Sequence, residues 1–372
     1  MNTDVRVKDI QYAVEILAPL HLAESWDNPG LQIGDCEEKV TGILTTLDVT
    51  PEAVQAAIEA KANMIVSHHP LFFKGLKHID YGTIKGRMIA DLIMHGIAVY
   101  SAHTNLDVAR GGLNDLAAAK IGLMDVKGLS KTGQDVMYKI VCFVPATHVE
   151  EVRLAMGDAG AGYIRGYSHC TFSANGVGTF KPHAGTSPFI GRINEMTAVE
   201  EVRLETIAPQ NRLQDIIAAM KEAHPYEEVA CDVYELVEPT TVHSIGRIGT
   251  LADTLSWDDF ASLVKIAFAR SQPRFGGARK ETVSRVALCT GSGAEFIGAA
   301  ASAGADVYIT GDVKYHDMQL AKEMGITVID AGHFGTEEGA AALLAAQINI
   351  NLAEAEKSVP VTVFNGQKDF FF

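Results

Sequence analysis

The side chains most able to do chemistry in this sequence are histidines and carboxylates that follow apolar, strand-like runs. They are His68, His69, His103, Asp107, His333 and Glu337. Imidazole nitrogens and bridging carboxylates suit Zn²⁺, Mn²⁺ or Fe²⁺. Four imidazoles and two carboxylates are enough groups for two ions, and neighbouring divalent ions activate water near neutral pH. We therefore predict a two-metal centre, with Zn²⁺ as the first choice and Fe²⁺ or Mn²⁺ as alternatives.

The spacing of these residues favours a common site, although each piece has a simpler explanation. The adjacent imidazoles of His68 and His69 follow the run 64–67 (MIVS), and ligands of parallel sheets collect beyond the carboxyl ends of strands. His103 and His333 each have an acid four residues later, which places both groups on one side of a helical turn. Taken singly, these patterns are also explained by surface histidines, helix caps or exposed polar pairs. Three such clusters at corresponding strand ends are hard to explain by packing.

Other polar residues are weaker candidates. Asp312 and His316 follow the run 307–310 (VYIT), where they are expected to bind substrate or to support the metal ligands. Asp312 is equally well explained as a cap of the next helix. Asp27 is predicted only to shape a turn. His224 ends an amphipathic helix and is predicted to interact with the helix dipole rather than with metal.

The elements that must position these residues occur twice. In the first and last thirds of the chain, apolar runs alternate with amphipathic helices, which is typical of βαβ units and a largely parallel sheet. Segment 60–67 (AKANMIVS) parallels 303–310 (AGADVYIT), and 96–102 (GIAVYSA) parallels 325–331 (GITVIDA). Any two βαβ units look alike, but this does not explain a His-x-x-x-acid pattern at the same place in both. We predict a duplicated α/β unit.

Between the two copies the chain follows a different plan. Strand-like runs and helices alternate as β-α-β-β-α-β, the order of a ferredoxin-like fold. One expected strand is 168–173, and the Gly-rich stretch 175–191 after it is predicted to be a long excursion from the sheet. The predicted fold class is α/β, with an inserted ferredoxin-like α+β domain. Residues 1–129 and 242–372 should form the duplicated domain, and residues 130–241 the inserted one.

Composition excludes several classes of function. The 372 residues include 31 Lys and Arg against 46 Asp and Glu, a formal charge of −15, which disfavours binding to duplex nucleic acid. No apolar run is long enough to span a membrane, and the N-terminus does not resemble a secretory signal. The five cysteines are odd in number and form no CxxC motif. A reduced, cytoplasmic location is therefore predicted.

Several motifs resemble those of the GTP cyclohydrolase 1 type 2 homologue family, also called the NIF-three-like dinuclear-metal proteins. The resemblance rests on WDNPGLQIG at 26–34, SHHP at 67–70, SAHTNLD at 101–107, TGDVKYH at 310–316 and GHFGTE at 332–337. The family pattern has Val where this chain has Pro29. The insert, with HPYEE at 224–228, resembles that of longer bacterial members, which is similar to CutA and PII-type trimeric domains.

This resemblance implies a site and an activity. The implied metal ligands are His68, His69, Asp107, His333 and Glu337. His103 matches a position beside the metals with a water-binding or proton-transfer role, whereas the symmetry of the two copies alone makes it a ligand equivalent to His333. The implied activity is metal-dependent hydrolysis of a nucleotide, with GTP suggested by the family name, or of a related small molecule. A phosphoesterase and a non-enzymatic metal-binding regulatory or scaffold protein are the alternatives. The resemblance also implies a homohexamer built as a trimer of dimers.

Overall fold

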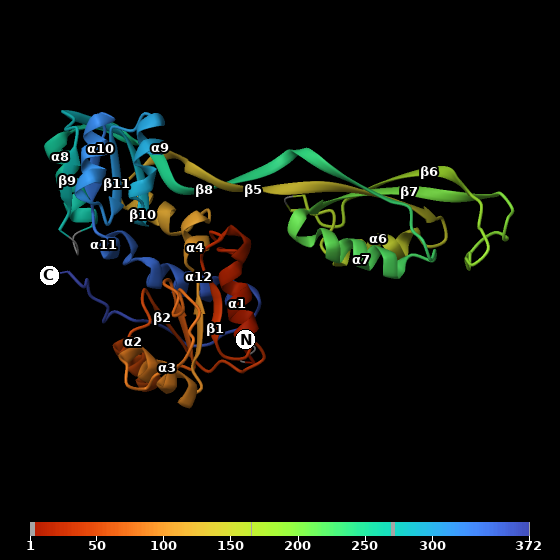
Figure 1. Ribbon diagram of the computed structural model, residues 1–372, viewed down its shortest axis with the longest axis horizontal. Coiled ribbons are helices and arrows are strands. Elements are labelled where there is room, and N and C mark those ends of the chain that lie inside the picture. The colour runs from red at the N-terminus through yellow and green to blue at the C-terminus, as the bar shows by residue number, and fades with distance from the viewer. Residues whose placement is uncertain (1–3, 165, 269–271, 372) are drawn as a thin grey trace. The chain divides into compact units, whose positions relative to one another are not determined.

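The computed structural model describes residues 4–164, 166–268 and 272–371 (Figure 1). The chain forms two compact units. One consists of Met1–Gly133 with His243–Phe372, and the other is Gln134–Val242. The first unit contains both copies of the α/β repeat, and the second is the inserted domain. None of the helices in the described residues combines the length and apolar character needed to cross a membrane.

The N-terminal copy builds a sheet with the strand order β1-β4-β3-β2-β13. These strands are β1 (Gly30–Ile33), β2 (Ile43–Thr46), β3 (Met64–Ser67), β4 (Ala98–Ser101) and β13 (Val361–Val363). Strands β2, β3 and β4 are parallel and are connected by helices α2 (Pro51–Glu59) and α3 (Ile84–Met94). Strand β1 runs antiparallel along β4. Helix α2 begins as predicted, because the Thr50 hydroxyl accepts a hydrogen bond from the Ala53 amide at 3.2 Å.

The C-terminal copy repeats this topology. Its strands β10 (Thr282–Ser292), β11 (Val307–Gly311) and β12 (Thr327–Asp330) are parallel, with helices α9 (Ile297–Ser302) and α10 (Tyr315–Glu323) between them. Strand β9 (Arg274–Gly277) runs antiparallel along β12, as β1 does along β4. The copies differ at the opposite edge, where β8 (Cys231–Ser256) is antiparallel to β10 but β13 is parallel to β2. The predicted duplication of the α/β unit is therefore confirmed.

Each copy contributes a helix to the sheet of the other. Helix α5 (Leu113–Lys120), from the N-terminal copy, packs in one core with strand β10. Helix α12 (Ala340–Glu354), from the C-terminal copy, packs against β2, β3 and helix α1 (Val7–Glu15). Two short helices, α4 (Thr104–Val108) and α11 (His333–Glu337), precede these exchanged helices in the chain. The exchange brings α4 and α11 together between the two sheets (Figure 1).

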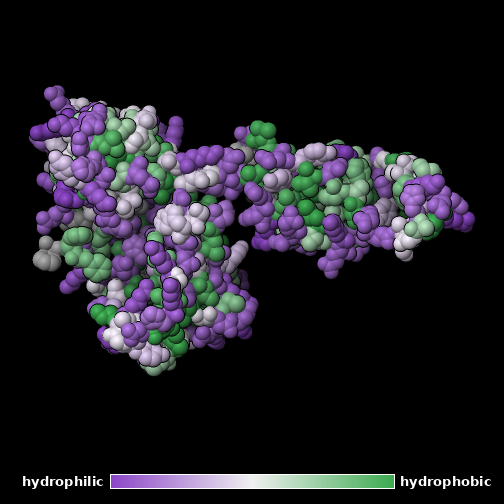
Figure 2. All heavy atoms as spheres, viewed as in Figure 1, coloured by the Kyte–Doolittle hydropathy of each residue, from purple (hydrophilic) through white to green (hydrophobic). Residues whose placement is uncertain are grey.

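The inserted domain has the predicted β-α-β-β-α-β order. Its elements are β5 (Met124–Pro145), α6 (Val149–Asp158), β6 (Thr171–Phe180), β7 (Thr197–Pro209), α7 (Leu213–Ala223) and β8. The sheet order β6-β7-β5-β8, with β7 antiparallel to both neighbours, is that of a ferredoxin-like fold. Helices α6 and α7 bury Val152, Met156, Ile216 and Met220 in the core of this domain. Large apolar side chains are also exposed, and apolar patches are visible on its surface in Figure 2.

The Gly-rich stretch of the insert differs from the prediction. Strand β6 begins three residues after the expected start and continues to Phe180, so it includes the first part of the predicted excursion. The backbone of this part pairs with β7 in unbroken register, from Thr171 opposite Thr206 to Phe180 opposite Thr197. Backbone pairing does not need large side chains, so small residues such as Gly176 and Gly178 did not end the strand. The segment outside the strands is 181–196.

Candidate metal centre

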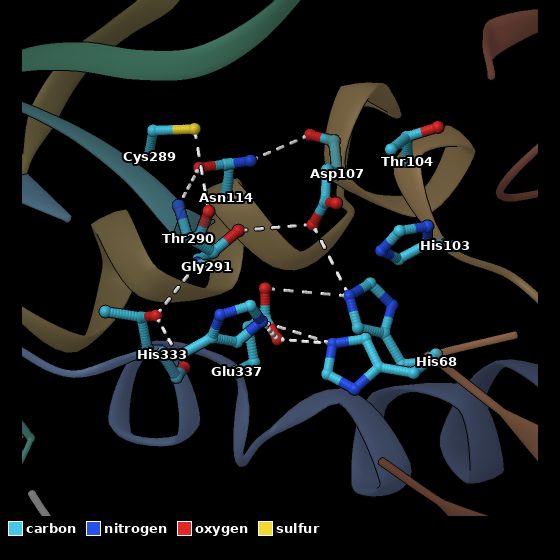
Figure 3. A network of polar contacts seen from close by, with 12 residues as sticks. His68, His103, Thr104, Asp107, Asn114, Cys289, Thr290, Gly291, His333 and Glu337 are labelled. Carbon is cyan, nitrogen blue, oxygen red and sulfur yellow. Dashed lines mark hydrogen bonds and ion pairs between the residues drawn. The ribbon is translucent and has the colours of Figure 1, made fainter. Parts of the chain in front are cut away.

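The predicted chemical residues come from three strand ends of the first unit. His68 and His69 follow β3, where the Ser67 hydroxyl donates a hydrogen bond to the His69 carbonyl at 2.8 Å and holds the turn. His103 caps the N-terminus of α4, which carries Asp107. His333 and Glu337 are the first and last residues of α11. The structure brings all six side chains into one cluster, five of which are labelled in Figure 3.

Glu337 is central to the cluster. Its Oε2 lies 3.0 Å from Nε2 of His69 and 3.1 Å from Nε2 of His333. Its Oε1 lies 3.8 Å from Nε2 of His68, and that nitrogen is 3.9 Å from Oδ1 of Asp107. Two groups with metal-ligating atoms in close reach therefore share Glu337: one with His69 and His333, the other with His68 and Asp107. Adjacent His68 and His69 belong to different groups of these two, and a third group joins both of them to His103.

Each of the four imidazoles is oriented by an outer partner. The Nδ1 atom of each ring lies within hydrogen-bonding distance of a carbonyl or carboxylate oxygen, so Nε2 is the nitrogen that remains to ligate a metal ion. These partners are the Ala102 carbonyl for His68 (2.8 Å), Asp48 for His69 (2.7 Å), Asp27 for His103 (2.8 Å) and Asp312 for His333 (2.7 Å). Metal-bound histidines almost always have such a partner, because it sets the tautomer and the ring orientation.

The cluster also contains an orphaned buried atom. The His68 side chain is fully buried, and its Nε2 has no hydrogen-bond partner within the described part of the chain. A buried polar atom without a partner is costly unless it binds something. Because this nitrogen faces Asp107 and Glu337, the buried donor set fits a divalent metal ion. The clusters therefore indicate metal binding.

Strand β10 supports the two carboxylates. The Thr290 hydroxyl donates to Asp107 Oδ1 at 3.1 Å, and Asn114 accepts from the Thr290 amide while donating to the Asp107 carbonyl. Gly291 has a φ of 63°, and a Cβ there would collide with the Glu337 carboxylate. Sequence reasoning missed these residues. For Thr290 and Gly291 the available signal was their place at the end of β10, which corresponds to the end of β2 near Asp48, whereas Asn114 lies on α5.

The electrostatics of the cluster follow from burial and mutual pairing. Burial opposes charge on His69, but hydrogen bonds to Asp48 and Glu337 outweigh it and raise the pKa of His69 to about 10. Burial likewise opposes charge on His333, but its hydrogen bonds to Glu337 and Asp312 outweigh this effect and raise its pKa to about 9. Burial also opposes charge on Glu337, but its contacts with the imidazoles hold its pKa well below the usual range. At Asp107 burial dominates and raises the pKa.

Asp27 has a larger role than the predicted turn. Its carboxylate accepts from Asn28, as a turn residue does, but it also contacts His103 Nδ1 and both the amide and the hydroxyl of Thr104. Burial opposes its charge, yet these hydrogen bonds lower its pKa to about 2. Asp27 therefore stays ionised and orients the His103 ring. Its position in the WDNPG motif was the only sequence signal.

Asp312 and His316, the two weaker candidates, lie in different surroundings in the structure. Asp312 does not cap the next helix, because α10 begins at Tyr315 and the Lys314 amide donates to Asp317 at 2.8 Å. Asp312 instead contacts His333. His316 is exposed on α10 and lies 3.3 Å from Gln319 Oε1. Its expected contact with substrate stays a prediction.

The fold and the site define a mixed α/β protein with buried histidine and carboxylate clusters, and comparisons with known proteins agree. The family model described as Duf34/NIF3 (NGG1p interacting factor 3) matches residues 5–369. A Bacillus subtilis protein named GTP cyclohydrolase 1 type 2 homolog is 39% identical over 372 residues, covering 99% of this chain and 98% of its own. A protein of the same name from Halalkalibacterium halodurans is 42% identical over 316 residues, 85% of each chain.

Solved structures also match this chain over its whole length. The crystal structure of a Bacillus cereus protein related to NIF3 superposes with a TM-score of 0.86 at 40% identity and covers 100% of both chains. A Staphylococcus aureus protein superposes with a TM-score of 0.80 at 30% identity, over 100% of this chain and 99% of its own. The chain therefore belongs to the Duf34/NIF3 family, and the resemblance inferred from its motifs is confirmed.

Proposed function

We propose that this chain is a hydrolase that uses two divalent metal ions to act on a nucleotide or a related small molecule. The observation that carries the proposal is the sharing of Glu337 between two ligand groups. His68, Asp107 and Glu337 would hold one ion, and His69, His333 and Glu337 the other. Such ions supply Lewis-acid activation of water near neutral pH. Zn²⁺ is the first choice for both positions, with Fe²⁺ or Mn²⁺ as alternatives.

His103 is the proposed proton-transfer residue. Its ring centroid lies 5.2 Å from that of His68 and 5.6 Å from that of His69, so it stands directly beside the proposed ligands. Asp27 holds its Nδ1 and can stabilise a protonated ring, while Nε2 exchanges a proton with water or with the leaving group. His103 also forms a possible ligand group with His68 and His69. A His103→Gln variant separates the two roles, because only loss of a ligand should lower the metal content.

Two exposed aromatic rings beside His103 favour a planar substrate. The ring centroids of Trp26 and Phe73 are 5.6 Å apart, and they lie 6.2 Å and 6.0 Å from that of His103. Both side chains remain about half exposed. A nucleobase stacks well on such rings, since every base has an aromatic face. Together with the name of the relatives, this points to a purine nucleotide, with GTP as the first candidate.

The test is turnover by the metal-loaded chain. Purified protein reconstituted with Zn²⁺, Mn²⁺ or Fe²⁺ is incubated with GTP and a panel of nucleotides, and released formate and phosphate are measured. Formate from GTP supports a cyclohydrolase, and phosphate without formate supports a phosphoesterase instead. A chain that holds two ions but acts on no member of the panel would favour the non-enzymatic, metal-binding alternative. His103→Gln should keep its metal and lose about 100-fold or more of any turnover.

A further inference from the structure

The inserted domain contains a cavity that the proposed hydrolysis does not use. Its volume is about 600 Å³, which is typical of small-molecule sites. The walls come from strands β6 and β7, from the segment 181–190 and from the HPYEE motif at 224–228. Four aromatic rings line it: Phe143, Phe180, Phe189 and Tyr226. The cavity lies wholly within the second unit.

The HPYEE motif builds one wall of this cavity. His224 is buried, its Nε2 donates to the Phe143 carbonyl at 3.0 Å, and its Nδ1 accepts from the Tyr226 amide at 3.1 Å. Burial lowers the pKa of His224, so at neutral pH it lacks the charge that the predicted interaction with the helix dipole requires. Its role is to fix the turn that carries Tyr226. Glu227 then accepts from the Ser187 amide at 2.9 Å and ties segment 181–190 to the motif.

The opposite wall holds a buried carboxylate. Glu201 is 9% exposed, and its Oε1 accepts a hydrogen bond from the Tyr226 hydroxyl at 2.9 Å. The carboxylate lies against Gly178, where any Cβ would collide with it. No lysine or arginine among the described residues forms an ion pair with Glu201. Buried carboxylates are normally paired with a cation, because burying an unpaired charge is costly.

Arg203 and Lys181 also line the cavity, but neither forms an ion pair with Glu201. Arg203 Nε donates to Glu205 at 2.7 Å, and the guanidinium lies 5.7 Å from the centroid of the Phe143 ring. Lys181 is exposed to solvent. Glu227 and Glu228 also line the cavity, but both are exposed, so Glu201 is its one buried carboxylate. This carboxylate and the phenol of Tyr226 are too few oxygen ligands for a metal ion. Aromatic faces around a buried negative charge instead suit an organic cation.

We propose that this cavity binds a small organic cation. An ammonium group would pair with Glu201, and an apolar or aromatic body attached to it would pack against Tyr226, Phe180 and Phe189. The ring centroids of Phe180 and Phe189 lie 6.0 Å and 6.3 Å from that of Tyr226, so the three rings form a continuous apolar wall. The site is separate from the metal centre, and it gives the HPYEE motif a function.

The test compares three probes of one shape and different charge. 2-Phenylethylamine, 2-phenylethanol and 3-phenylpropionate are titrated into the full, metal-loaded chain, and binding is followed by calorimetry or ligand-observed NMR. The amine should bind about 10- to 100-fold more tightly than the alcohol, because the alcohol can donate a hydrogen bond to the carboxylate but cannot form an ion pair with it. The carboxylate should bind least, since it meets Glu201.

Variants locate the binding. Glu201→Gln should remove the preference for the amine over the alcohol. Glu200→Gln, at an exposed position of the same strand outside the cavity wall, should keep that preference. Phe189→Ala, in the exposed segment, should weaken the binding of amine and alcohol alike, and it tests the location of the site if Glu201→Gln does not fold. Equal binding of amine and alcohol, no binding of the amine at millimolar concentration, or an equal loss in Glu200→Gln would overturn the proposal. Metal content, measured in parallel, tests the other site independently.

Discussion

Replacing Glu337 by Gln should empty both proposed metal positions at once. The substitution keeps the size of the side chain, but it removes the charge and one of the two ligating oxygens. Glu337 is the residue shared by the group of His69 and His333 and the group of His68 and Asp107. Asp107 belongs to one group, so Asp107→Asn should affect one ion. We expect two ions per chain in the unmodified protein, about one in Asp107→Asn, and fewer than one in Glu337→Gln.

The size of the effect follows from the role of Glu337 as a ligand of both ions. Loss of an outer hydrogen-bond partner of a metal ligand already weakens metal binding about 10- to 100-fold, or about 1.4–2.7 kcal/mol. Glu337 is a proposed direct ligand, so the affinity for each ion should fall by at least that much. The combined weakening should reach at least about 100- to 10,000-fold. Gly291, which faces the carboxylate, has no side chain and supplies no replacement ligand.

The assay is metal analysis of the protein after gel filtration in the presence of a weak chelator. Glu338→Gln is the matched control, because its carboxylate lies 3.3 Å from Lys120 Nζ rather than in a ligand group. Circular dichroism and a thermal unfolding curve establish that each variant is folded. A folded Glu337→Gln protein that retains two ions would refute the shared role of Glu337. A Glu338→Gln protein that loses both ions would refute the location of the site.

Further changes test the surroundings of the centre and the assembly. Asp48→Asn removes the carboxylate that orients His69 through Nδ1 and should weaken metal binding about 10- to 100-fold in calorimetric titrations. His224→Ala, in the inserted domain, should leave the metal content unchanged. After the metal is removed by chelation, the free energy of unfolding should fall as pH rises from 6.5 through about 10. The reason is that His69 and His333, whose pKa values are raised in the folded chain, stabilise it only while they are protonated. Denaturation curves across this range should show the fall, and its absence would contradict the pairing of both imidazoles with Glu337. Light scattering should give a mass of six chains, and a mass near 39.9 kDa would reject the hexamer. Deleting residues 130–241 and closing the gap with a short linker should preserve metal binding but weaken assembly.

Much of the first unit was predictable from the sequence, because its signals are local. Strands β3, β4 and β12 have the predicted bounds, since buried parallel strands appear in a sequence as short continuous apolar runs. The His-x-x-x-acid spacing likewise placed both groups on one side of α11, because the pitch of a helix depends only on the backbone, whereas His103 precedes α4 as its N-cap residue. The duplicated topology followed from matching segments along the chain. Strand β6 was misplaced because its small residues carry little local signal.

The inequality of the two copies was decided by the tertiary structure. The sequence repeat predicts equivalent roles for His103 with Asp107 and for His333 with Glu337. In the structure, however, Glu337 lies in both groups of ligating atoms described above and Asp107 in one. Glu337 contacts His333 of its own copy, but its other imidazole partners, His68 and His69, belong to the N-terminal copy, and His69 is 268 residues away in the sequence. The outer partners Asp27 and Asp48 lie in the same copy as His103 and His69, but they are 76 and 21 residues away in the sequence, so local spacing does not reveal them. Spacing along the backbone is a local property, whereas the contacts of Glu337 with His68 and His69 exist only because the two copies exchange helices and close their strand ends around one centre.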